Sequence, residues 1–127
     1  MNKVLIVEDH ADIRRLIRMT LEFEDCEIFE ASNGESGLVS AARILPDVVL
    51  LDVMMPGEFD GLEVCRMLKL TPGLADVKVV ILSASGTATD VQKGIAAGAN
   101  AYLVKPFSPL ELTRVVQSLA THTASAA

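Results

Sequence analysis

The chain has 127 residues, half of them hydrophobic, and a formal net charge of −6 at pH 7. This length suits a single domain whose core is large enough to fold without disulfides or a structural metal. No apolar run approaches the roughly 20 residues of a spanning helix, and the first residues lack an export signal, so we expect a soluble, cytoplasmic protein. The acidic balance argues against direct binding of nucleic acid, which needs clustered Lys and Arg.

Five short aliphatic segments predict β-strands, and they recur at regular intervals along the chain. Three of them are almost continuously apolar, as strands covered on both faces of a sheet must be. The segments cover residues 3–7, 27–31, 48–51, 78–82 and 101–104.

Amphipathic segments between these strands predict helices, each with one apolar side facing the core. The first stripe is formed by Ile13, Leu16, Ile17, Thr20 and Leu21, and the last by Leu112, Val115, Val116 and Leu119. Two helix starts fit the capping-box pattern. They are "SNGE" at residues 32–35 and "SPLE" at residues 108–111.

A fivefold alternation of strand and helix predicts an α/β fold with a doubly wound, five-stranded parallel sheet, because each crossover must be right-handed and must cover one face. No internal repeat or second domain is evident. We expect one domain over residues 1–121, followed at residues 122–127 by a flexible tail that is either a frayed helix end or the start of a linker.

Polar side chains follow four of the predicted strands at their carboxyl ends. Glu8 and Asp9 follow the first strand, Asp52 the third, Ser83 the fourth and Lys105 the fifth. In open α/β sheets the ligand site lies beyond these ends, where the strand order reverses. We therefore expect all five side chains to meet at one edge of the sheet.

Three carboxylates at one place repel one another, at roughly 3 kcal/mol for each pair about 5 Å apart in an effective dielectric of about 20. A single lysine, Lys105, cannot offset three such pairs, so protons or a divalent cation must enter. Oxygen ligands favour a hard ion such as Mg²⁺. Asp52 is also a candidate nucleophile, because a carboxylate can accept a phosphoryl group whose oxygens Mg²⁺, Lys105 and the Ser83 hydroxyl would stabilise.

With these residues in place, the chain resembles the receiver domains of two-component response regulators from about residue 3 to about residue 120. The resemblance depends on an ordered set of motifs at the ends of four strands and in the connections between them. They are Glu8-Asp9 after "VLIV", Asp52 after "VVLL", "MPG" followed by Asp60-Gly61, "LSA" with Ser83, Gly98-Ala99, and "YLVKPF" with Tyr102, Lys105 and Pro106. It implies the (βα)5 flavodoxin-like receiver fold.

The resemblance also implies a role for each matching residue. Asp52 corresponds to the phosphoacceptor, and Asp9 to a direct Mg²⁺ ligand. Glu8 would assist the metal through water, and the backbone carbonyl of Met54 would complete the protein ligands. The resulting function is a phosphorylation-dependent signalling switch that assists only its own phosphorylation and dephosphorylation.

Signal output in this family depends on a pair of residues that Ser83 and Tyr102 resemble. The hydroxyl of the first moves toward the phosphoryl group, and the aromatic ring of the second turns inward. The Lys105–Pro106 bond is similar to the family's cis peptide. The implied partners are a sensor histidine kinase or histidine phosphotransfer protein and an unidentified effector. The surface of the fourth helix, fifth strand and fifth helix would change on phosphorylation and could support a homodimer.

The sequence departs from the family pattern at two places. The loop "MMPGEFDG", residues 54–61, is one residue longer than the common form. Asn100 and Ala101 stand where the branch with winged-helix output often has two acids, so we do not assume the charged dimer contact of that branch.

Three further features have ordinary structural explanations. His10 adjoins the acids, but we expect it to begin the first helix and face solvent, outside the site. Arg14, Arg15 and Arg18 fit either a solvated helix face or a docking surface for the phosphodonor. Gly94 inside the fourth helix costs about 1 kcal/mol relative to alanine, which predicts a marginal, easily moved helix.

Two enzyme-like or ligand-binding alternatives fit the sequence less well. A phosphatase or mutase of the haloacid dehalogenase type also uses an Asp nucleophile on a parallel sheet, but it needs a second acid where this chain has Met54. A flavin or nucleotide binder needs Gly, Ser or Thr after the first strand, whereas the anionic "EDHAD" would repel phosphate in the absence of a metal ion.

Overall fold

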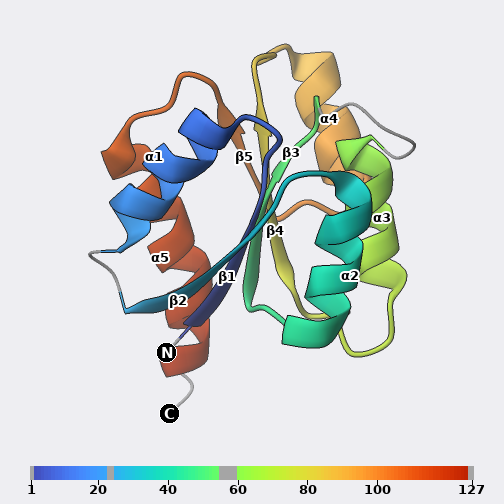
Figure 1. Ribbon diagram of the computed structural model, residues 1–127. Coiled ribbons are helices and arrows are strands. Elements are labelled where there is room, and N and C mark those ends of the chain that lie inside the picture. The colour runs from blue at the N-terminus through green and yellow to red at the C-terminus, as the bar shows by residue number, and fades with distance from the viewer. Residues whose placement is uncertain (1, 23–24, 55–59, 126–127) are drawn as a thin grey trace.

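The computed structural model describes residues 2–22, 25–54 and 60–125. Strands and helices alternate along the chain, as the sequence predicts (Figure 1). The strands are β1 (Asn2–Val7), β2 (Cys26–Ala31), β3 (Val48–Asp52), β4 (Lys78–Ser83) and β5 (Ala101–Val104). The helices are α1 (Ala11–Leu21), α2 (Gly34–Ile44), α3 (Gly61–Leu70), α4 (Ala88–Ala96) and α5 (Pro109–Ser125).

The five strands form one parallel sheet in the order β2-β1-β3-β4-β5, which confirms the predicted flavodoxin-like fold. After β1 the chain adds β2 on one side and then crosses to place β3 on the other side. The strand order therefore reverses between β1 and β3. This is the point at which α/β sheets of this kind place their ligands.

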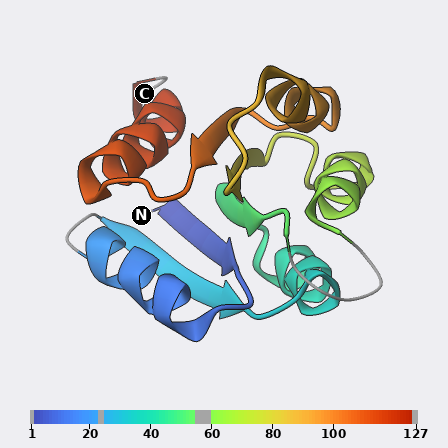
Figure 2. The same cartoon turned by 90° about the horizontal axis from the view of Figure 1, so that it is seen from above.

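Helices cover both faces of the sheet and form two separate cores. Helices α1 and α5 lie on one face, and α2, α3 and α4 lie on the other (Figures 1 and 2). Side chains of β3 alternate between the two cores, with Val48 and Leu50 toward α1 and α5 and Val49 and Leu51 toward α2 to α4. All four are fully buried, which explains why the strand is continuously apolar.

Helix starts agree with the sequence at α5 but not at α2. At α5, the Glu111 N–H donates to Ser108 Oγ and the Ser108 N–H donates to the Glu111 carboxylate, so the predicted capping box is confirmed. At α2 the N-cap is Asn33 rather than Ser32, and its side chain accepts from the Ser36 N–H. The predicted pattern was one residue early, because either side chain can cap a helix.

The apolar stripe predicted for α5 includes buried core residues, whereas the stripe predicted for α1 is buried only in part. Leu112 and Val116 of α5 are buried in the same core as Ile17 and Leu21 of α1. Leu16 of α1, predicted to face the core, is 52% exposed. The buried side of α1 is therefore narrower than the sequence pattern suggests.

Helix α5 continues through residues 122–125, and the division of the chain at residue 121 stays a prediction. Across the part of the chain that the structure describes, no helix combines the length and apolar character that crossing a membrane requires.

Candidate functional site

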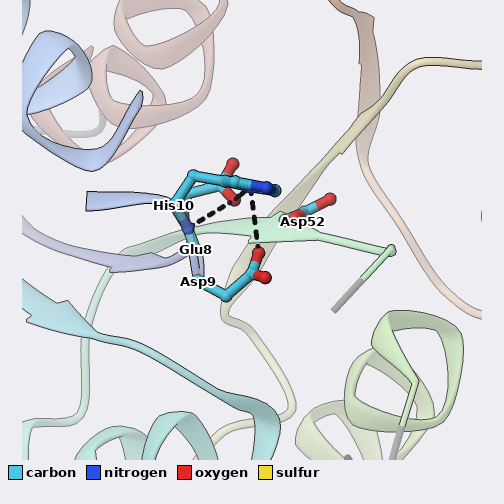
Figure 3. A group of neighbouring side chains, drawn as sticks. All are labelled: Glu8, Asp9, His10 and Asp52. Atoms are coloured by element: carbon cyan, nitrogen blue, oxygen red, sulfur yellow. Dashed lines mark hydrogen bonds and ion pairs between the residues drawn. The ribbon is translucent and has the colours of Figure 1, made fainter. Parts of the chain in front are cut away.

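The predicted acids meet at the carboxyl edge of the sheet, between β1 and β3. The register of these two strands brings the residue after β1 level with the last residue of β3. Figure 3 shows the side chains of Glu8, Asp9 and Asp52 gathered there, together with His10. One oxygen or ring nitrogen from each of the four residues lies within 4.8 Å of the others. The predicted convergence of the three acids is thus present.

Two of the acids are buried and share one lysine. Glu8 is fully buried and Asp52 is 1% exposed. The Lys105 Nζ lies 2.7 Å from Glu8 Oε1 and 3.6 Å from Asp52 Oδ1. Asp52 Oδ1 also accepts from the backbone N–H of Met54 at 3.0 Å. Lys105 therefore offsets part of the negative charge, most directly that of Glu8.

The neighbouring carboxyls of Glu8 and Asp52 have pKa values shifted in opposite directions. Burial, followed by the interaction with Glu8, raises the pKa of Asp52 to about 6. Burial also disfavours the charged form of Glu8, but hydrogen bonds with Asp52, Lys105 and His10 lower its pKa to about 2. Near neutral pH both carboxyls are largely ionised, and a proton that enters the pair binds Asp52 first.

The donor set fits a hard divalent cation. Among the described residues, Asp52 Oδ2 and Asp9 Oδ1 are buried oxygens that accept no hydrogen bond. Such oxygens are costly unless another group satisfies them. Carboxylate oxygens on one edge of the sheet, with lone pairs to spare, are the ligands that Mg²⁺ takes together with water.

His10 is closer to the acids than the sequence analysis expected. It does form the N-cap position of α1, and its side chain is 58% exposed. However, its Nδ1 lies 3.1 Å from Glu8 Oε2 and 3.2 Å from Asp9 Oδ1. The expectation that His10 begins α1 and faces solvent is confirmed, and its exclusion from the functional site stays a prediction, although its ring nitrogen contacts two of the acids. Its position directly after the acid pair was the available signal.

The sequence left two explanations for Arg14, a solvated helix face or a docking surface, and the structure shows that its side chain is not simply solvated. One guanidinium nitrogen, Nη1, donates to the backbone carbonyl of Glu8 at 2.8 Å, and Nε donates to Glu30 Oε1 at 3.0 Å. Arg18 donates to the other oxygen of Glu30 at 2.8 Å and is more exposed. Arg14 thus connects α1 and β2 to the backbone of the acidic segment.

Ser83 and Tyr102 lie beside a cavity of about 200 Å³ next to the acidic site. Ser83 is buried, and its Oγ accepts from the backbone N–H of Ser85 at 3.1 Å. The half-buried Tyr102 donates its hydroxyl proton to the Ser85 carbonyl at 2.6 Å. Both predicted switch residues therefore contact the same segment after β4. The other lining residues are Val53, Met54, Asp60, Leu62, Asp90 and Lys93.

Gly94 has a packing role that its helix propensity did not suggest. A Cβ at this position would lie 2.9 Å from Ile81 Cδ1 and 3.1 Å from Tyr102 Cδ2. Glycine therefore lets α4 approach the sheet and the Tyr102 ring closely.

Two other expectations concern the loops around the site. The Lys105–Pro106 peptide bond is cis, as the resemblance implies. Most of the lengthened loop, residues 55–59, lies outside the described residues.

Asn100, which replaces an acid of the winged-helix branch, uses its Oδ1 to accept from the Val79 N–H and from Lys69 Nζ, each at 2.9 Å. It thereby joins α3 to the start of β4.

The sheet order, the acids at its switch point and the neighbouring lysine together define a receiver-type signalling module rather than an enzyme. Residues 4–117 match the family described as the response regulator receiver domain. The chain belongs to this family.

Curated relatives include longer regulators. The chain is 43% identical over 120 residues to the transcriptional regulatory protein ResD of Bacillus subtilis, covering 92% of this chain and 47% of that protein. It is 42% identical over 127 residues to the transcriptional regulatory protein SrrA of Staphylococcus aureus, covering 98% and 50%. The chain therefore spans about half the length of the curated relatives it matches.

Solved receiver structures are similar over nearly the whole chain. The chemotaxis response regulator CheY4 of Vibrio cholerae superposes with a TM-score of 0.88 at 31% identity, covering 94% of this chain and 98% of that one. The receiver domain of the sensor histidine kinase PA1611 of Pseudomonas aeruginosa, solved with a magnesium ion in its active-site cleft, has a TM-score of 0.84 at 28% identity. That match covers 93% of this chain and 96% of the other.

Proposed function

We propose that this chain is a phosphorylation-dependent switch whose phosphoacceptor is Asp52. The main support for the proposal is the environment of this carboxylate. It is buried, one of its oxygens accepts no hydrogen bond from the described residues, and Lys105 lies 3.6 Å from the other. A desolvated carboxylate with a free lone pair and a nearby cation is suited to attack phosphorus.

In the proposed reaction, an Asp52 oxygen forms a bond to phosphorus while the nitrogen–phosphorus bond of a phosphohistidine donor breaks. Asp9, Asp52 and the Met54 carbonyl would hold Mg²⁺, with Glu8 acting through water, and the ion would neutralise the phosphoryl oxygens. Lys105 compensates the charge on Asp52, and the backbone N–H of Met54 holds the same oxygen, Oδ1, which leaves Oδ2 free to attack.

The proposed output uses the contacts around the cavity. Ser83 would turn its hydroxyl from the Ser85 N–H toward the new phosphoryl group, and Tyr102 would give up its bond to the Ser85 carbonyl and move inward. Both of these hydrogen bonds are present in the described structure. Because Tyr102 belongs to β5 and packs against Gly94 of α4, its movement would alter the surface of α4, β5 and α5.

A receiver domain of this family implies a histidine kinase or phosphotransfer protein as donor. The receiver of the Pseudomonas aeruginosa sensor kinase supports Mg²⁺ as the cofactor, since its structure contains that ion in the cleft. The names of ResD and SrrA suggest a transcriptional output for proteins of this kind. For this chain the effector, and a homodimer through α4, β5 and α5, are proposals.

The test is incubation with Mg²⁺ and acetyl phosphate followed by intact mass measurement. The wild-type chain should gain one phosphoryl group that is stable in acid and labile in base, as an acyl phosphate is. Asp52→Asn should gain none, and EDTA should prevent labelling of the wild type.

Asp76→Asn serves as the matched control, because Asp76 is exposed and lies before the amino end of β4, away from the site. It should be labelled as the wild type is. Equal labelling of the wild type and Asp52→Asn would reject Asp52 as the acceptor.

A further inference from the structure

The acidic site contains a nitrogen donor that a magnesium site does not require. His10 Nδ1 lies 3.1 Å from Glu8 Oε2 and 3.2 Å from Asp9 Oδ1, and an Asp52 oxygen completes a group within 4.8 Å (Figure 3). Metal bonds of about 2.1 Å would span such separations at an angle of about 95–100°. This lies between the octahedral and tetrahedral values, so His10 Nδ1 is separated from each of these two oxygens by a distance that suits two ligands of one ion.

Two buried oxygens of this group accept no hydrogen bond within the described part of the chain, and this is a second observation, besides the grouping of the acids, that indicates a bound ligand. Asp52 is 1% exposed, and its Oδ2 accepts no hydrogen bond from the described residues. Asp9 Oδ1 is also buried without a hydrogen bond, although it lies near the His10 ring. The group therefore offers oxygens whose burial is uncompensated until an additional cation binds.

The imidazole is exposed, and its Nδ1 contacts only acids of the site among the described residues, so a metal ion would replace those contacts and no helix-capping bond. His10 occupies the N-cap position of α1, but its side chain makes no capping hydrogen bond. Its side chain is 58% exposed, so the ring can be reached from solvent. The ring can therefore serve as a ligand without weakening the start of α1.

We propose that Glu8, Asp9, His10 and Asp52 form a mixed oxygen–nitrogen site that binds borderline transition-metal ions, represented by Zn²⁺, through His10 Nδ1. Imidazole favours Zn²⁺ and its neighbours in the first transition row, whereas Mg²⁺ prefers oxygen ligands and retains its waters. His10 thus determines which cation occupies the site. The inference extends the proposed function because Mg²⁺ and Zn²⁺ would compete for the same acids.

The experiment measures Zn²⁺ binding and identifies the ligand atom separately. Nitrogen-15 NMR of the imidazole rings at pH 8 should show the His10 Nδ1 resonance shifting on addition of Zn²⁺ but not of Mg²⁺. The second histidine of the sequence, His122, provides an internal reference that should not shift. Calorimetric titration of the metal-free protein then gives both affinities.

His10→Ala should weaken Zn²⁺ binding by more than about tenfold, the usual lower bound for loss of a metal-supporting group, and should change the Mg²⁺ affinity less than the Zn²⁺ affinity. His122→Ala, which removes the other imidazole, should bind both ions as the wild type does. Thermal unfolding of each metal-free variant shows whether the fold is intact.

Unchanged Zn²⁺ affinity in His10→Ala, or an unshifted His10 resonance, would overturn this inference. If Mg²⁺ still binds in that case, the proposed function remains standing. If neither ion binds the wild type, both fail.

Discussion

At the scale of single residues, Asp52 is buried because the strand that carries it is buried along its entire length. The apolar run of β3 lies between two helical layers, and Asp52 is its last residue. Glu8 follows the neighbouring buried strand, so two carboxylates face each other where water cannot separate them. Lys105 interacts with both but favours Glu8. The raised pKa of Asp52 is a consequence of this arrangement.

In metal-free protein, this arrangement predicts a dependence of stability on pH. The folded-state pKa of Asp52, about 6, lies above its ordinary value of 3.8, so folding is favoured as the pH falls through this window. In EDTA, we expect the free energy of unfolding of the wild type to rise between pH 7 and pH 5 by about 1 kcal/mol relative to Asp52→Asn. Urea unfolding at each pH measures both proteins.

Glu8 produces the opposite effect at lower pH. Its pKa falls from 4.5 to about 2, so the stability it contributes is lost as the pH decreases from about 4.5 toward 2. The comparison between wild type and Asp52→Asn should therefore be made above pH 5. Parallel pH profiles of the two proteins would contradict the assignment of the raised pKa to Asp52.

Gly61 is a second residue with a specific spatial requirement. A Cβ there would lie 2.3 Å from the Val53 Cα and 2.6 Å from the Asp52 carbonyl oxygen, and neither backbone atom can yield easily. We expect Gly61→Ala to reduce the free energy of unfolding by about 2–3 kcal/mol, as overpacking does.

Gly94→Ala is the matched control, because the atoms that its Cβ would meet belong to side chains that can adjust. It should destabilise less than Gly61→Ala, partly because alanine favours the interior of α4. Urea unfolding of both variants decides the order, and a larger loss in Gly94→Ala would contradict this explanation.

At the scale of secondary-structure elements, the strands could be predicted closely from the sequence. All five differ from their predicted bounds by at most one residue at one end. Long aliphatic runs between polar segments leave little freedom in placing a buried strand. Two of the differences arise where a strand ends in a polar residue that still pairs in the sheet, Asp52 or Ser83, and the other two where β1 and β2 begin one residue early, at Asn2 and Cys26.

Helix faces and loop contacts were less predictable. Leu16 has the spacing of a core residue but is exposed, because periodicity specifies a helix and not the width of the surface that it buries. The acids of the site could be located, since they follow strands. The contacts of His10 and Arg14 could not, since they depend on how the segment after β1 turns and on which side-chain conformers it allows.

Arg14 gives a testable link between α1 and the metal site. Because its Nη1 holds the Glu8 carbonyl, we expect Arg14→Ala to loosen the acidic segment and weaken Mg²⁺ binding by about tenfold. Calorimetric titration of Mg²⁺ measures the change.

Arg18→Ala is the control for charge, since Arg18 contacts the same Glu30 as Arg14 but no backbone of the acidic segment in the described part of the chain. It should bind Mg²⁺ nearly as well as the wild type. An equal loss in both variants would mean that Arg14 acts only through its charge.

At the scale of the whole molecule, the sheet connects the acidic site to a distant surface. Ser83 ends β4 beside the site, and Tyr102 of β5 contacts both the Ser85 carbonyl and the region of Gly94 in α4. The surface of α4, β5 and α5 exposes the apolar side chains Ile95, Val104 and Leu110. Under the proposed function, we expect a change at Ser83 to alter this surface.

A phosphoryl mimic such as beryllofluoride, added with Mg²⁺, should change amide hydrogen exchange in α4, β5 and α5 more than in α2. The reason is that Tyr102, which shares the Ser85 segment with Ser83, lies in β5 and packs against Gly94 of α4. Asp52→Asn with the same additions is the control and should show no change. Unaltered exchange in the wild type would contradict the proposed output surface.

The central claim is that the buried acids need a cation, and thermal unfolding of the wild type and Asp52→Asn with EDTA or Mg²⁺ tests it most directly. In EDTA, Asp52→Asn should be the more stable protein because it lacks one buried charge. Mg²⁺ at about 100 times its dissociation constant should stabilise the wild type by about 2.7 kcal/mol and the variant much less. A wild type that does not respond to Mg²⁺, and that is at least as stable as Asp52→Asn in EDTA, would contradict the account.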